Sequence, residues 1–148
     1  MKKLLFILLL ALFLPLTAWA DVWQDPETGV NYEYTEGSGE ASVIKSNVGG
    51  NIPILPYIIV NEYFYEVTSI GESAFKDCKG LTSINMPEEL TSIAPRAFEN
   101  CSSLTSIIIP ESVTNIGYFA FYNCSGLTSI NIPESVNNMG RQAFDGCI

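Results

Sequence analysis

The chain has 148 residues, enough for one domain of ordinary size, and its 7 basic and 16 acidic side chains give a net charge of −9. This sign argues against nucleic acid as a partner, because phosphate groups attract basic surfaces. The sequence contains no histidine, so it lacks the commonest general base and the commonest metal ligand.

Residues 1–20 have the pattern of a cleaved secretory signal peptide. Two lysines precede an apolar run at 4–16, and the sequence AWA ends the segment with a small-x-small cleavage pattern. The run is too short, and too abruptly followed by polar sequence, for a membrane-spanning helix. Cleavage before Asp21 would leave 5 basic and 16 acidic residues, a net charge of −11. We therefore expect a secreted chain that is extracellular or bound at the cell surface, with the periplasm as an alternative, and no membrane insertion after cleavage.

Residues 21–66 are predicted to form a β-rich N-terminal cap. Alternation in NYEYTE and in EYFYEV is typical of strands. We expect the aromatic side chains of this segment to cover the open first coil of the repeats that follow. These aromatic residues are Trp23, Tyr32, Tyr34, Tyr57, Tyr63, Phe64 and Tyr65.

The remaining segment, 67–148, is an internal repeat. Its period is set by four cysteines that follow one another at intervals of 23 residues: Cys78, Cys101, Cys124 and Cys147. The units are 67–89, 90–112, 113–135 and a partial fourth at 136–148. Each complete unit has apolar residues at the same eight positions, which in the second unit are Leu90, Ile93, Ala97, Phe98, Cys101, Leu104, Ile107 and Ile109.

Each unit is predicted to contain strands joined by a short helical segment. The stretch L-x-x-I-x-I/M alternates, is rich in β-branched residues and ends at a proline that cannot donate to a ladder. The linking stretch G-x-x-A-F-x-x-C suits about two turns of helix with an inward face. One unit cannot bury its apolar face alone, whereas stacked units cover one another. The sequence therefore predicts a solenoid.

The cysteines are expected to be buried free thiols. No pair has the short C-x-x-C spacing of a metal site. Strands of adjacent coils lie about 4.8 Å apart, and equivalent side chains point the same way, so their Cβ atoms exceed the separation of about 3.5–4.5 Å that a disulfide needs. Because secretion permits disulfides, that alternative stays open.

The pattern VTSIGxxAFxxCxxLTSIxIPES over 67–148 resembles the BspA-like leucine-rich repeat, a 23-residue class of secreted and surface proteins. Residues 52–66 resemble the lead-in to the first repeat of that family, and 29–46 its hairpin-like cap. The resemblance implies a leucine-rich-repeat solenoid, a right-handed curved coil with a β-rich N-terminal cap, used for adhesion or protein–protein contact. It transfers no catalytic residue.

Two sets of residues are candidates for partner binding. One set lies between the inward strand positions and is expected to face solvent: Ser83, Asn85, Ser106, Ile108, Ser129 and Asn131. Such ladders suit hydrogen bonding to a polypeptide or a sugar, and equally suit ordinary solvation. The other set is Tyr118, Phe119 and Tyr122, which replace mainly polar residues of the other units. These aromatics form either an exposed contact patch or a cover over neighbouring turns.

The leading hypothesis is a secreted or cell-surface adhesion module that binds a protein or glycan, such as host matrix or another cell surface, through the repeats. We expect no catalysis and no cofactor, because Glu88 and Glu89 are the only adjacent acid pair and one coil position does not form a catalytic pocket. We also expect no metal site, because the glutamates of one column (Glu88, Glu111, Glu134) are interpreted as a solvated row rather than a Ca²⁺ site. The alternatives are a structural or assembly component of the cell envelope and a truncated fragment of a longer repeat protein. The partial unit would then expose an apolar edge suited to end-to-end self-association.

Overall fold

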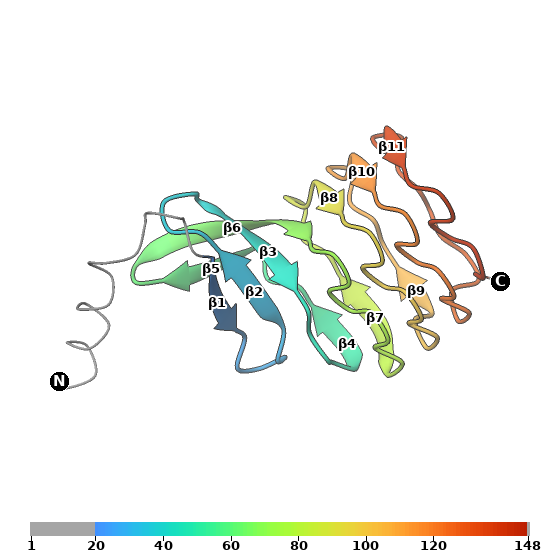
Figure 1. Cartoon of the computed structure of the whole chain (residues 1–148), viewed down its shortest axis with the longest axis horizontal. Helices are drawn as coiled ribbons and strands as arrows, with labels where there is room; N and C mark the ends of the chain where they lie inside the picture. The colour runs from blue at the N-terminus through green and yellow to red at the C-terminus, as the bar shows by residue number, and fades with distance from the viewer. Residues whose placement is uncertain (1–19, 148) are drawn as a thin grey trace.

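A computed structural model describes residues 20–147, which form a stack of coils running from the N-terminal strands to the coil that contains β11 (Figure 1). All but the last residue of the predicted signal peptide lie outside this range. The strands are β1 (Asp21–Gln24), β2 (Asn31–Tyr34), β3 (Glu40–Ile44), β4 (Gly50–Pro53), β5 (Tyr57–Val60), β6 (Tyr63–Ile70), β7 (Leu81–Asn85), β8 (Ser92–Ile93), β9 (Ser106–Ile107), β10 (Asn115–Ile116) and β11 (Asn138–Met139).

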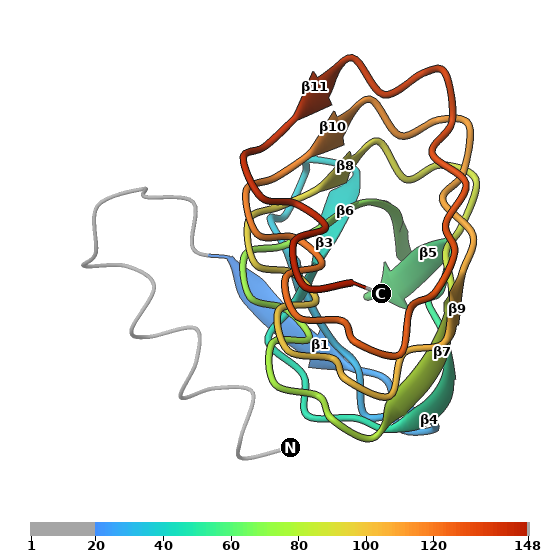
Figure 2. The same cartoon turned by 90° about the vertical axis from the view of Figure 1, so that its right-hand side faces the viewer.

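The strands form two sheets on different sides of the coils (Figure 2). The larger sheet has the order β1-β2-β3-β6-β8-β10-β11, with β5 paired to β6, and the smaller has the order β4-β7-β9. Pairing is antiparallel in the β1–β2, β2–β3 and β5–β6 pairs, and parallel from coil to coil. In the repeats the register joins residues 23 apart, as between Ile70 and Ile93 or Ile84 and Ile107. The predicted solenoid is therefore confirmed.

The linking segments are runs of turns, and residues 20–147 contain no helix, so the prediction of short helical segments is wrong. In 71–78 the backbone N–H groups alternate between two kinds of partner. Ala74 donates to the carbonyl of Gly71 in its own coil (3.2 Å), whereas Phe75 donates to Ala97 in the next coil (2.8 Å). A helix would direct every N–H along its own axis, and the coils would lose these bonds to one another. The described residues accordingly include no helix able to cross a membrane.

Two columns of left-handed residues also interrupt any helix. One column consists of Asp77 (φ 64°), Asn100 (φ 63°), Asn123 (φ 58°) and Gly146 (φ 80°). The other consists of Ser73 (φ 57°), Arg96 (φ 59°), Phe119 (φ 58°) and Gln142 (φ 57°). Asp, Asn and Gly are the residues that tolerate positive φ most readily. The Asp, Asn or Gly that precedes each cysteine in the sequence therefore indicated a turn rather than a helix at this position.

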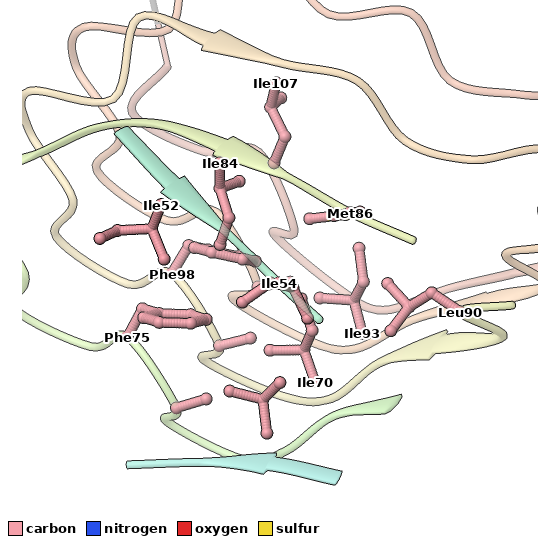
Figure 3. Close-up of a cluster of buried hydrophobic side chains, with 14 of the residues drawn as sticks. Ile52, Ile54, Ile70, Phe75, Ile84, Met86, Leu90, Ile93, Phe98 and Ile107 are labelled. Carbon is pink, nitrogen blue, oxygen red and sulfur yellow. The ribbon is translucent and has the colours of Figure 1, made fainter. Parts of the chain in front are cut away.

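The core consists of stacked identical positions, and all eight predicted inward positions of the second repeat are buried. Phe98 stacks on Phe75 (ring centroids 5.3 Å apart) and on Phe121 (5.0 Å), with the rings nearly parallel. Figure 3 shows Phe75 and Phe98 one above the other, with isoleucines from successive coils around them. Each coil therefore supplies one layer of the core, as the stacking argument requires.

The strands β3 and β4 add a coil ahead of the repeat recognised in the sequence. They pair in parallel with β6 and β7, matching Val43 with Ile70 and Ile52 with Ile84. These offsets are 27 and 32 residues, and the segment has no cysteine, so a search at period 23 cannot find it. The position at which the cap ends and the repeats begin stays a prediction.

The strand predicted before Pro133 does not form. Residues 127–132 have no assigned strand, and the smaller sheet ends at β9. Residues 105–107 and 129–131 together line a shallow hollow of about 350 Å³.

Candidate interaction surfaces

The first predicted set of residues lies in and beside the smaller sheet. Asn85, Ser106, Ser129 and Asn131 are exposed, whereas Ser83 is half-buried and donates from Oγ to Oδ1 of Asn51 at 2.7 Å. Most of these side chains therefore face solvent, although the hydroxyl of Ser83 is already engaged within the protein. Their role in partner binding stays a prediction.

Ile108 is the apolar exception on this surface. Its side chain is 77% exposed, more than any other large hydrophobic residue in the described chain. It follows β9 directly, between Ile107 and Ile109, which both point into the core. An exposed β-branched side chain on a polar surface gives a partner one apolar contact.

Tyr118, Phe119 and Tyr122 come together as a second surface, here called the aromatic ridge. The ring of Phe119 lies edge-on to both tyrosines, with centroids 5.9 Å from Tyr118 and 5.2 Å from Tyr122. Tyr118 is 43% exposed and the other two are half-buried. The ridge belongs to the turn segment after β10, so it is separate from the smaller sheet.

Charged side chains of the preceding coils extend the ridge. The Cζ of Arg96 lies 6.0 Å from the ring centroid of Tyr118 and 5.8 Å from that of Phe119, within reach of a cation–π interaction. Glu99 forms an ion pair with Lys76, with Oε1 and Nζ 3.1 Å apart. Its other carboxylate oxygen, Oε2, lies 3.6 Å from Nε of Arg96, which is too long for a hydrogen bond. Sequence reasoning did not identify Arg96, because its column in the other units contains unrelated residues.

A shallow hollow of about 560 Å³ borders the ridge. It lies across β8, β10 and β11, and Tyr118, Asn115 and Asn138 are among its lining residues. Nδ2 of Asn138 donates to Oδ1 of Asn115 at 2.7 Å, so the two amides form a polar ladder beside the exposed tyrosine. The ridge and the hollow together offer aromatic faces next to hydrogen-bonding groups.

The four cysteines are free thiols, as predicted; Cys78, Cys101 and Cys124 are buried and Cys147 is half-buried. Each donates from Sγ to a backbone carbonyl of the previous coil, at 3.1 Å for Cys78, 3.0 Å for Cys101, 3.1 Å for Cys124 and 3.3 Å for Cys147. Burial raises the pKa of all four, to about 12 for Cys124. Thiols held protonated in this way are structural rather than reactive.

The glutamate column is exposed along its length, at Glu88, Glu111 and Glu134. Between residues 20 and 147 no three Asp, Glu or Cys side chains gather closely enough to hold a metal ion.

The aromatic side chains of the N-terminal segment divide between core and surface. Tyr32 and Tyr65 are buried, as expected of a cap, but Tyr57, Tyr63 and Phe64 are at least half exposed, so the expectation that all of them cover the first coil is wrong. Adjacent strand residues point to opposite faces, and the run Tyr63-Phe64-Tyr65 was a signal that some aromatic must face outward.

The comparisons with known proteins agree with this architecture. Residues 54–148 match the BspA type Leucine rich repeat region in six copies. No curated protein matches the sequence.

Three solved structures illustrate the relationship. A leucine-rich repeat protein from Bacteroides ovatus is 36% identical over 80% of this chain and 32% of its own, with a TM-score of 0.74. One from Bacteroides capillosus is 28% identical over 80% and 86%, with a TM-score of 0.72. A leucine rich cell surface protein from Faecalibacterium prausnitzii is 30% identical over 85% and 34%, with a TM-score of 0.73.

The chain thus spans about a third of the Bacteroides ovatus and Faecalibacterium prausnitzii proteins. The repeat pattern, the stacked coils and the matched region lead to one conclusion. The chain belongs to the BspA-type leucine-rich repeat family.

Proposed function

We propose that this protein is a secreted or cell-surface, non-catalytic interaction module that binds a protein or glycan partner through the surface of its repeats. The proposal agrees with membership of a leucine-rich repeat family and with the description of the similar Faecalibacterium prausnitzii protein as a cell surface protein. The adhesive partner would be host matrix or another cell surface.

The aromatic ridge is the observation that carries this proposal. Tyrosine and arginine are among the residues most enriched at binding hot spots. Both occur here in contact, with the Tyr118 ring 5.9 Å from that of Phe119 and 6.0 Å from Cζ of Arg96.

Binding assays on immobilised matrix proteins and on a glycan array test the proposal, with protein expressed from the full-length sequence. We expect a ligand whose binding falls about tenfold or more when Tyr118, Phe119 and Tyr122 are all replaced by Ser. Ser102→Glu, at an exposed turn of the second repeat, should leave binding unchanged. Equal binding by the triple variant would contradict a role for the ridge, and no binding to either panel would contradict the adhesive function.

A second candidate function, assembly with further coils, rests on the coil at 136–147. Met139 is 49% exposed and Phe144 is half-buried, with one ring face stacked on Phe121 at 5.0 Å. We propose that this apolar edge packs against a coil of another chain, including a second copy. Light scattering should then show oligomers that Met139→Lys disperses and Asn131→Lys does not. A monomer at every concentration would contradict assembly with its own copy.

A further inference from the structure

The outer face of the β5–β6 hairpin carries exposed aromatic side chains that the proposed function does not use. Tyr57 is 50% exposed and Phe64 is 64% exposed, and their ring centroids lie 5.6 Å apart. Ile59, directly opposite Phe64, is also 50% exposed. The hairpin lies at the N-terminal end of the molecule, away from the coil with β11 (Figure 1).

The hairpin is anchored to the core through its inner face. Its inner face places Ile58 and Tyr65 in the core. Asn61 (φ 51°) and Glu62 (φ 71°) form its two-residue turn, whose positive φ angles match the twist of the strands. The backbone that carries the exposed rings is therefore anchored by core packing, which reduces the cost of ordering it on binding.

Carboxylates surround the two rings. Tyr57 and Phe64 line a groove of about 420 Å³ together with Glu66 and Glu89. Glu66 is paired across the sheet with Glu40, and both are exposed. Like charges directly opposite one another destabilise a sheet. No ion pair formed within residues 20–147 includes any of these three glutamates, so the groove is negatively charged.

Glu89 departs from the repeat pattern at the place where the first coil meets this groove. The equivalent positions in the next two units are Ser112 and Ser135, whose hydroxyls donate to backbone carbonyls at 2.6 and 2.8 Å. At residue 89 this bond is replaced by an exposed carboxylate on the edge of the groove. The substitution adds negative charge beside the aromatic rings.

We propose that this groove binds an arginine side chain of a basic polypeptide segment. The guanidinium stacks on an aromatic face while its forked N–H groups donate to the glutamates, a combination that lysine cannot match. The two rings contact each other at an angle of 56°, so they form a shelf and do not enclose a cage of the kind that quaternary ammonium groups need. The glutamates do not gather as metal ligands in the described chain, which favours an extended organic cation over a metal ion.

Calorimetric titration with a peptide of alternating glycine and arginine tests this site, again on protein expressed from the full-length sequence. We expect binding at low salt that weakens about fivefold to tenfold in Phe64→Ala and in Glu66→Gln. The Lys peptide should bind more weakly, and a citrulline peptide, which keeps the shape but not the charge, should not bind.

Matched controls come from the same hairpin. Tyr63 is 63% exposed but does not line the groove, so Tyr63→Ala should bind within about twofold of the wild type, and Glu62→Gln should do the same. Glu66→Gln preserves side-chain size, so it remains informative even if Phe64→Ala fails to fold. Absence of binding, equal loss in groove and control variants, equal binding of the citrulline peptide, or tighter binding of a trimethyllysine peptide would overturn the proposal.

Discussion

The thiol of Cys124 donates a hydrogen bond to the carbonyl oxygen of Phe98 in the preceding coil, with Sγ and O 3.1 Å apart. The same contact joins Cys101 to Phe75 and Cys147 to Phe121. Each cysteine thus bonds to the backbone of its neighbour coil rather than to another sulfur. The 23-residue spacing of the cysteines records a structural contact, not a redox function.

Thiol reactivity should follow burial. In native protein treated with a thiol-specific reagent, we expect Cys147 to react first, because it is half-buried, and Cys101 and Cys124 to react only as the protein unfolds. Mass spectrometry of timed samples identifies the modified residue. Rapid modification of Cys101 in folded protein would contradict the buried ladder.

Stability should fall in alkaline solution. Burial raises the pKa of Tyr32 to about 12 and that of Cys124 to about 12. The unfolded chain releases these protons at lower pH than the folded chain, so folding is favoured below about pH 9 and is progressively weakened up to about pH 12. Each fully shifted group contributes at most about 1.4 kcal/mol per pH unit.

Urea unfolding measured across this pH range checks the expectation. Tyr32→Phe removes one titrating group, so its stability should decline less steeply than that of the wild type. The comparison concerns the slope, because this variant also loses the bond from the N–H of Leu55 to the tyrosine oxygen (3.1 Å). A free energy of unfolding that stays constant or rises with pH would contradict the raised pKa values of the buried Tyr32 and Cys124.

The phenylalanine stack should dominate stability. Phe98 is fully buried between two other rings, so Phe98→Ala should lower the free energy of unfolding by about 3–5 kcal/mol. Ile108→Ala, at a 77% exposed position of the same repeat, should change it by no more than about 0.5 kcal/mol. If urea unfolding gives similar losses of free energy for the two variants, the stacked phenylalanines do not form the stabilising core.

The free energy of unfolding should depend on which residue type occupies the positive-φ position before each cysteine. Asn123→Gly should cost at most about 1 kcal/mol, because glycine occupies this position in the last unit and adopts positive φ freely. Asn123→Val should cost more, about 1–3 kcal/mol beyond the glycine variant, because a β-branched residue is strained there. Equal melting temperatures for the two variants would contradict the turn geometry.

The repeat, its core positions and its solvent-facing strand residues were predictable because each coil places equivalent residues in equivalent environments. The helical prediction failed because Ala97, Phe98 and Cys101 have inward spacing in turns as well as in a helix. Hydrogen bonding between coils, which no single unit reveals, favours the turns. The coil formed by β3 and β4 and the groove at Tyr57 depend on strand pairing with no regular period, so spacing alone cannot predict them.

The most direct test of the aromatic ridge as a surface for a partner is thermal unfolding of the variant with Ser at 118, 119 and 122. We expect cooperative unfolding within about 6 °C of the wild type, equivalent to a loss of roughly 1–2 kcal/mol. Phe121→Ser, a change to the fully buried ring within the same stretch, should abolish the native fold or lower the melting temperature far more. If the triple variant loses cooperative unfolding as Phe121→Ser does, the three aromatics are structural cover and the central claim is wrong.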